Sequence, residues 1–547
     1  MNENLPRWDM TTIYPAPDSP EFLQDIERAE GLMKQMSTIG DFNECSRIVT
    51  TIACYCEALL STDTSSKLFL EAEGKADLLA SEWEKASTEF LRGFDGELSA
   101  EYSYFQEKLK TEKEHMMSPA EEDLASSLAL CGSSAWERLQ MTLASSISAD
   151  GKTLTELRSL AYDEDRSVRE KAFRSEKKLV AEHSAAIAAS LSGIKGWTLE
   201  LEKRRGWASP LDRALFSSNM SMEALDALMA SIKDSLPLFR RYLKWKARHL
   251  GLDKLSFYDI FAPVGKSGRY SYEEAKAIVI AAYGSFSGDM ADFASKAYDS
   301  LWVDVPPCKG KAGGAYDTFF PLRGESRIFM NFDGTYNSVS TLAHETGHAY
   351  HDSVIKDLPP LLADYPMTLA ETASTFGERL VYEYMLGRSS GEEELFMIEQ
   401  FVSSVCQVIV DIYSRFLFES AAFELRRSGD FLPSDLCSLM LKAQQDSYGD
   451  LAEYHEYMWA VKSHYYSADL SFYNYPYAFG QLFALALASR RHEPGFDRTY
   501  RELLRKTGSM SAEAVALTAG CDITDKGFWD SGMKLVESEI RRLEEWN

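Results

Sequence analysis

Helical periodicity runs through almost the whole chain, and this feature constrains the fold more than any other. Apolar residues recur every three to four positions in long stretches with few breakers, as in 42–60, 67–90 and 392–427. Only the segment 315–332 contains two short β-type runs joined by a turn, the pattern typical of a hairpin. The sequence therefore predicts a mainly α-helical protein with one small antiparallel β-sheet.

Composition and charge exclude several classes of protein. The 547 residues are 45% apolar and 26% charged, as in ordinary globular proteins. The net charge of −26 argues against nucleic acid and anionic membranes as partners. The chain has no run of about 18 apolar residues, and its first eight residues lack the apolar core of a signal peptide. Eight scattered cysteines without a CxxC pair favour a reducing compartment, so we expect a cytoplasmic protein.

The stretch directly after the predicted hairpin contains the motif His344-Glu345-x-x-His348. In a helix, which Asn337 or Ser338 would cap, the two histidines lie one turn apart, about 6 Å along the axis. Both imidazoles then point from the same face toward one cation, and Zn²⁺ suits such ligands while leaving a position open. Glu345 is placed to take a proton from a water molecule there, which predicts a catalytic base.

A third ligand is needed, and Glu371 is the best candidate. It follows His348 by 23 residues, and the turn at Pro359-Pro360 can bring its helix back against the first one. Glu378 lies on the same face as Glu371 and could be a rival ligand, a hydrogen-bond partner of an imidazole or an exposed ion-pair residue. We expect a structural or surface role for His351.

A third region, 459–480, is dense in aromatic residues and contains His464, Tyr473 and Tyr477. Such density is often only packing of a core or rim. Hydroxyl and imidazole groups near a zinc–peptide site could, however, donate hydrogen bonds to the oxyanion that forms when water attacks a carbonyl.

The motif helix, the spacing to Glu371 and the 464–477 segment together resemble the oligoendopeptidase F / thimet oligopeptidase family of zinc peptidases. The resemblance extends to the 310–320 loop and strand, the 163–169 helix start and Trp8-Asp9, and so covers nearly the whole chain. It implies a two-lobed helical body with a deep channel, one zinc ion at its base and oligopeptides as substrates. The implied metal ligands are His344, His348 and Glu371, with Glu345 as base, His464 and Tyr477 as transition-state donors, and Tyr473 as a weaker donor candidate.

The sequence thus predicts a zinc endopeptidase of oligopeptides. We expect an N-terminal helical lobe over residues 1–200, with a helical subdomain at about 110–190, and a catalytic domain over 201–547. The alternatives are a catalytically silent, helical peptide-binding protein and an exopeptidase of the same zinc class. The GxMEN motif of aminopeptidases is absent, so the exopeptidase alternative is one that releases C-terminal dipeptides or one that releases tripeptides.

Overall fold

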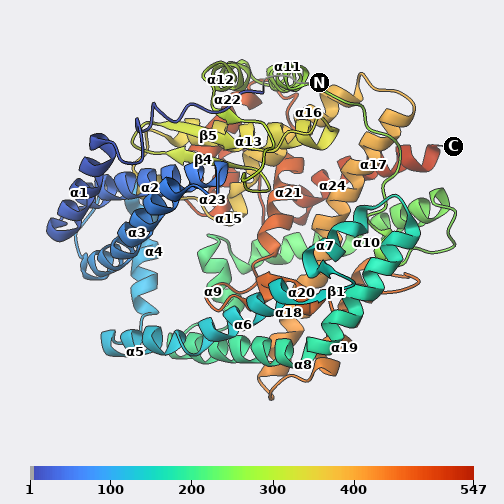
Figure 1. Cartoon of the computed structure of the whole chain (residues 1–547), viewed down its shortest axis with the longest axis horizontal. Coiled ribbons are helices and arrows are strands. Elements are labelled where there is room, and N and C mark those ends of the chain that lie inside the picture. Colours follow the sequence, from blue (N-terminus) through green and yellow to red (C-terminus); the bar gives the residue numbers. More distant parts are fainter. Residues whose placement is uncertain (1–4, 547) are drawn as a thin grey trace. The chain divides into compact units, whose positions relative to one another are not determined.

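The computed structural model describes residues 5–546, and the chain is built almost entirely from helices (Figure 1). The predicted mainly α-helical fold is confirmed. Contacts divide the chain into two compact units that alternate along the sequence. Unit 1 contains the described residues up to 113 together with 267–389 and 487–521, and unit 2 contains the remainder. The boundaries of these units differ from the single boundary expected at residue 200. The chain leaves unit 1 after residue 113 and returns to it at residue 267.

Unit 1 contains the larger of the two sheets and the helices around it. Its first helices begin with side-chain caps, since Ser19, Thr38 and Ser66 each accept a backbone N–H at the start of a helix. Its helices are α1 (Pro20–Gln35), α2 (Ile39–Thr62), α3 (Lys67–Gly93), η1 (Ala100–Tyr102), α4 (Ser103–Glu114), α11 (Tyr272–Gly284), α12 (Gly288–Asp299), α13 (Tyr336–Ile355), α14 (Pro360–Ala363), α15 (Met367–Ala370), α16 (Thr372–Leu386), α22 (Phe496–Arg505) and α23 (Ala512–Thr518).

The sheet of unit 1 has the strand order β3-β5-β4. Strands β4 (Tyr316–Phe320) and β5 (Glu325–Phe329) form the predicted antiparallel hairpin. A further strand, β3 (Val303–Asp304), pairs with β5 in parallel, so the sheet is mixed. Two residues carry too little alternation to indicate a strand, which is why the sequence did not reveal β3. Both hairpin strands contact α13, and the sheet therefore supports the motif helix (Figure 1).

Helix α13 begins earlier than the sequence indicated. Its N-terminal cap is Thr335, whose hydroxyl accepts the backbone N–H of Ser338. The cap expected at Asn337 or Ser338 is wrong, because the Asp333 carboxylate organises the preceding turn by accepting from the Thr335 backbone N–H at 3.0 Å and the Ser338 hydroxyl at 2.6 Å. These bonds fix the start of the helix and so the direction of its later side chains.

Helices α13 and α16 pack with their backbones in close approach. A Cβ atom added at Gly347 would lie 2.6 Å from the Ala373 carbonyl oxygen and 2.7 Å from the Ser374 Cα atom, too close for any side chain. The Tyr283 hydroxyl supports the same region by donating to the Ala343 carbonyl oxygen at 2.6 Å. Glycine at position 347 is therefore what allows the first turn of α16 to reach the motif helix.

Unit 2 is built around long helices and a two-stranded ribbon. The ribbon turns at Asp150 and Gly151, which both have positive φ. Its elements are α5 (Pro119–Ala129), α6 (Ser133–Ser146), β1 (Ser148–Ala149), β2 (Lys152–Thr153), α7 (Leu154–Ser159), η2 (Leu160–Tyr162), α8 (Arg166–Arg204), α9 (Pro210–Ser217), α10 (Met222–His249), η3 (Phe257–Asp259), α17 (Glu392–Cys406), η4 (Gln407–Asp411), α18 (Ile412–Arg426), α19 (Pro433–Tyr448), α20 (Met458–Val461), η5 (Ser463–Tyr466), α21 (Tyr475–Ala488) and α24 (Lys526–Glu545).

The predicted long apolar helix of unit 2 is confirmed, but a π-helical turn, η4, interrupts it between α17 and α18. Among the described residues it is the one helical stretch long and apolar enough to cross a membrane. Within an apolar 18-residue segment of that stretch, 61% is buried inside the protein, and the stretch carries two buried carboxylates. Glu399 pairs with Lys246 of α10 at 2.6 Å, and Glu419 pairs with Lys195 of α8 at 2.6 Å. It is therefore a helix of the core of unit 2.

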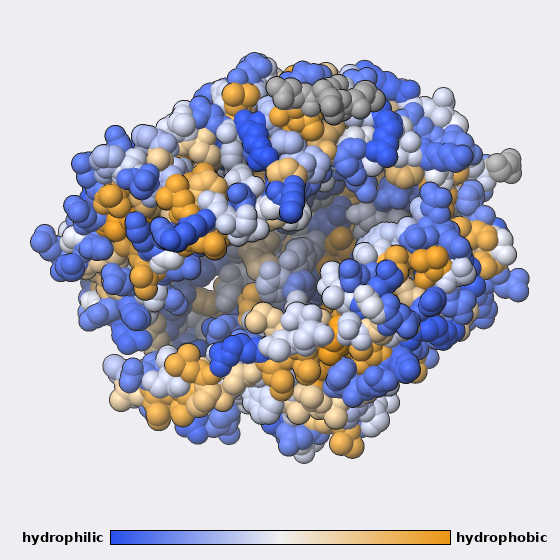
Figure 2. All heavy atoms as spheres, viewed as in Figure 1, coloured by the Kyte–Doolittle hydropathy of each residue, from blue (hydrophilic) through white to orange (hydrophobic). Residues whose placement is uncertain are grey.

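The surface seen in Figure 2 is mainly hydrophilic, as the strong negative charge of the chain suggests. Hydrophobic side chains gather on it over helices α5 and α6. On α5, on α6 and in the turn between them, four hydrophobic side chains are exposed by about half or more, namely Leu124, Leu128, Leu130 and Met141.

Candidate metal centre and active site

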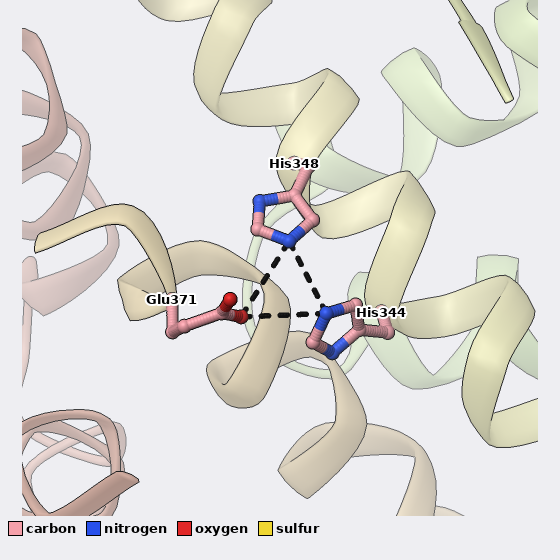
Figure 3. Close-up of side chains that lie close together, drawn as sticks. All are labelled: His344, His348 and Glu371. Atoms are coloured by element: carbon pink, nitrogen blue, oxygen red, sulfur yellow. Dashed lines mark hydrogen bonds and ion pairs between the residues drawn. The ribbon is translucent and has the colours of Figure 1, made fainter. Parts of the chain in front are cut away.

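Three predicted ligand atoms converge in unit 1 (Figure 3). The Nε2 atoms of His344 and His348 lie 3.2 Å apart. The Oε2 atom of Glu371 lies 3.3 Å from the first of them and 3.5 Å from the second. About a quarter of each of these side chains is exposed, so the site is open to solvent.

The dimensions of this triangle fit a small metal ion. Tetrahedral Zn²⁺ with bonds of about 2.0–2.1 Å places neighbouring ligand atoms about 3.3–3.4 Å apart, and the three observed separations scatter around that value. Burial opposes ionisation of Glu371, but hydrogen bonding to His348 and the charges of the two imidazoles lower the pKa of its carboxyl to about 2. The group is therefore a carboxylate throughout the physiological range, the form that binds a cation.

Local structure holds Glu371 in place. The residue lies at the break between α15 and α16, with φ −85° and ψ 6°, so its side chain leaves the chain where two helices meet at an angle. The Ser374 hydroxyl, one turn further on, donates to Glu371 Oε2 at 2.7 Å. The carboxylate is thus oriented by its own helix before any ligand arrives.

Glu378 is the hydrogen-bond partner of an imidazole rather than a member of the triangle. Its Oε1 atom accepts from His344 Nδ1 at 2.6 Å, and its Oε2 atom accepts from the Ser340 hydroxyl at 2.9 Å. Burial lowers the pKa of His344, but the bond and charge of Glu378 outweigh it and raise that pKa to about 9. Because Nδ1–H donates its hydrogen bond to Glu378, Nε2 is the atom directed toward the triangle.

The Glu378→Gln variant should bind zinc about 10–100-fold more weakly while keeping its fold, since loss of the carboxylate weakens the orientation and basicity of His344. A competition titration against a coloured chelator measures this change, and circular dichroism reports the fold. The control is Glu273→Gln, which changes an exposed glutamate of α11 in the same unit. Equal affinity of Glu378→Gln and Glu273→Gln would contradict the assigned role.

Glu345 lies beside the triangle on α13 and is almost completely buried, with 6% of its surface exposed. Burial raises the pKa of its carboxyl, the two imidazoles oppose that shift, and the Glu371 and Glu378 carboxylates add to it. A carboxylate with a raised pKa accepts a proton more readily than an exposed one, which suits a general base.

His351 has a structural role. It is fully buried, and its Nε2 atom lies 3.1 Å from the Leu504 carbonyl oxygen and 2.9 Å from the Thr507 hydroxyl. Its ring stacks on Tyr365 with 4.4 Å between ring centroids. Burial lowers the pKa of His351 to about 3, so the imidazole is neutral. His351 therefore joins α13 to the end of α22. Of the two roles expected from the sequence, structural or surface, the structure supports the structural one.

The three predicted donors come together in unit 2. The ring centroids of His464 and Tyr473 lie 4.5 Å apart, those of His464 and Tyr477 lie 6.2 Å apart, and those of the two tyrosines lie 5.9 Å apart. Phe472, directly before Tyr473, is buried and has φ +56°, a conformation that bulky residues rarely adopt. Its backbone N–H donates to the buried Glu419 carboxylate at 3.1 Å, which holds this strained turn in place.

A polar chain orients His464. Arg415 donates to the Asn474 side-chain oxygen at 2.7 Å, so this oxygen is an acceptor, and His464 Nδ1 must be the donor in their 2.9 Å contact. The Nε2 atom is therefore the free functional atom of the ring. Burial lowers the pKa of His464, and the charges of Arg415 and Lys462 add to this effect. The sequence did not indicate a role for Asn474 or Arg415, although Asn474 lies within the aromatic segment 459–480.

Two models of known protein families match this chain. The family model for peptidase family M3 matches residues 159–535, and that for oligopeptidase F matches residues 87–148. The chain belongs to peptidase family M3. Membership identifies this M3 peptidase as a metallo-endopeptidase, which confirms the predicted enzyme class.

Several relatives align with this M3 peptidase over most of its length. The group B oligopeptidase PepB of Streptococcus agalactiae is 25% identical over 98% of this chain and 96% of its own. The oligopeptidase PepF of Bacillus subtilis is 27% identical over 81% of this chain and 69% of its own. The family and these relatives indicate a peptidase that acts on oligopeptides.

Solved structures confirm the fold of the M3 peptidase. A putative peptidase from Chlamydophila abortus superposes with a TM-score of 0.87 at 20% identity and covers 98% of both chains. The oligoendopeptidase F of Enterococcus faecium superposes with a TM-score of 0.67 at 19% identity and covers 96% of this chain and 97% of its own. The resemblance inferred from sequence motifs is thereby confirmed.

Proposed function

We propose that the protein is a zinc-dependent endopeptidase that hydrolyses internal bonds of short peptides in the cytoplasm. The observation that carries this proposal is the triangle of His344 Nε2, His348 Nε2 and Glu371 Oε2, with edges of 3.2–3.5 Å and Glu345 beside it on the same helix. These three residues would hold the ion. When bound, zinc would act as a Lewis acid that polarises the peptide carbonyl and makes water more acidic.

Glu345 would move the proton. Its buried carboxylate takes a proton from the attacking water and passes it to the amine that leaves when the peptide bond breaks. Burial supports both halves of this role, because the raised pKa of the carboxyl makes the protonated intermediate state accessible. No other residue is needed as base in this scheme.

Tyr477 and His464 would stabilise the oxyanion. A tyrosine hydroxyl can donate a hydrogen bond at any physiological pH, whereas His464 Nε2 donates only when the ring is protonated. Since burial lowers the pKa of His464, we assign the principal donor role to Tyr477 and a secondary one to His464. Tyr473, stacked on His464, would act mainly by fixing the ring.

The peptide itself would bind along β4. The strand order β3-β5-β4 leaves β4 at the edge of the sheet, with one side of its backbone unpaired within that sheet. An extended peptide can add to such an edge through main-chain hydrogen bonds, which hold the backbone without selecting side chains.

Metal analysis together with product mapping tests this function. The purified protein should contain one zinc ion per chain and should cleave a mixed library of peptides at internal bonds, as seen in product masses. An apo protein that binds library peptides without cleaving them would instead support the silent peptide-binding alternative. Release of single terminal residues would support an exopeptidase.

A further inference from the structure

A cavity of about 560 Å³ lies within unit 2, and His464 and Tyr477 are part of its wall. Helices α7, α8, α18 and α20 and the π-helical turn η4 contribute the other sides. π-helical turns inside α-helices often mark functional sites, and here the turn brings Asp411 into the cavity wall. Much of the lining is apolar, with Phe173, Phe257 and Met458 among its residues.

The charges on the cavity wall do not balance. Three arginines line it, and each has a carboxylate partner. Lys462 also lines the cavity, yet its ammonium forms no hydrogen bond or ion pair with any other residue that the structure describes. The three arginine pairs are Arg158 with Glu176 at 3.3 Å, Arg169 with Asp259 at 3.2 Å, and Arg415 with Asp411.

An unpaired ammonium in such a place is costly. Burial lowers the pKa of Lys462 to about 8, with the charges of Arg415 and Arg158 acting in the same direction and those of Asp411 and Glu176 against it. The side chain therefore still carries its charge at neutral pH. A carboxylate bound from solution would restore the missing partner and compensate the cost of burial.

The position of Lys462 limits which carboxylate can bind. Lys462 directly follows α20 and precedes His464 by two residues. The cation and the proposed oxyanion donors line the same cavity. A compact space of this volume is about 10 Å across and accommodates about three extended peptide residues at about 3.3 Å each. A carboxylate held by Lys462 would therefore lie only a few residues from the bond that is cleaved.

We propose that Lys462 binds the C-terminal carboxylate of the peptide substrate, so that cleavage is favoured about two to three residues before the C-terminus. This inference rests on the proposed peptidase function and specifies its substrate class, peptides with a free C-terminus close to the scissile bond. Long chains and C-terminally amidated peptides would lose this contact and be cleaved less efficiently.

A pair of matched substrates tests the proposal. One peptide carries a free C-terminal acid and the other, of identical sequence, carries an amide. For the wild-type enzyme, amidation should lower kcat/KM by about 10–100-fold, mainly through KM, because a hydrogen-bonded charge pair is lost. In Lys462→Met the two peptides should be cleaved at nearly equal rates, and in Lys462→Arg the preference for the acid should largely persist.

The controls separate this proposal from the function on which it rests. Lys442→Met removes an exposed lysine of α19 and should keep the wild-type preference. Cleavage of the amidated peptide by Lys462→Met shows that the peptidase function holds even if the preference does not. Equal effects of amidation in the wild type and in Lys462→Met would overturn the proposal. An amidated peptide ending in glutamate that matched the free acid would also overturn it, in favour of a side-chain carboxylate.

Discussion

The Glu345→Gln variant is expected to keep its zinc and its fold but to lose on the order of 10⁴-fold in kcat, the upper range for a positioned proton-transfer group. The amide has nearly the same shape as the carboxylate and fits the same buried position. It cannot accept a proton from water, however, and it cannot return one to the leaving amine. Both proton transfers assigned to Glu345 are therefore lost in one substitution.

Single-turnover cleavage of a quenched fluorescent peptide measures the loss, and metal analysis of the same sample measures zinc. Retained zinc is essential to the interpretation, since His344 and His348 flank the substituted position and a distorted helix would release the metal. Glu273→Gln again serves as a control for the general effect of removing one carboxylate from unit 1. A Glu345→Gln enzyme with substantial turnover would rule out this residue as the base.

The Tyr477→Phe variant is expected to lower kcat by about 10²–10³-fold and to change KM little, as seen when one oxyanion donor is removed from other hydrolases. The ring remains to pack near His464 and Tyr473, so the substitution removes the hydroxyl alone. A hydroxyl that acts only in the transition state contributes nothing to substrate binding, which is why kcat and not KM should respond.

Tyr473→Phe provides the comparison within the same aromatic cluster. Its ring stacks on His464 with 4.5 Å between centroids, a contact that phenylalanine preserves, so we expect a much smaller loss of kcat. Steady-state kinetics of both variants with one peptide gives the two parameters. A change confined to KM in Tyr477→Phe would show that the hydroxyl binds substrate and does not stabilise the transition state.

The parts of the site that the sequence revealed are those set by local geometry. The helical period alone places His344 and His348 on one face, and a turn followed by a helix brings Glu371 back to them. The partners of these residues are harder to predict. Glu378 could be assigned as the partner of His344 only once the approach of α16 to α13 was known, because three roles are equally compatible with its spacing.

Features that depend on contacts between distant segments were not predicted. Arg415 reaches Asn474 across 59 positions, and nothing in the sequence near either residue indicates their pairing. The strand β3 and the π-helical turn η4 are also set by their surroundings. The strand has only two residues, and the π-helical turn adds a single backbone position, so neither leaves a periodic signal in the sequence. The alternation of the two units along the chain has the same origin.

The order in which the chain visits the two units has a consequence for any attempt to dissect the enzyme. In one hydrophobic cluster of unit 1, Trp8, Tyr14 and Ile52 pack together with Phe320 and Phe329 of the hairpin strands. A fragment that starts at residue 201 would retain every proposed zinc ligand, yet it would expose that hairpin to water. Removing the amino-terminal segment should therefore yield an insoluble or metal-free product rather than a minimal protease.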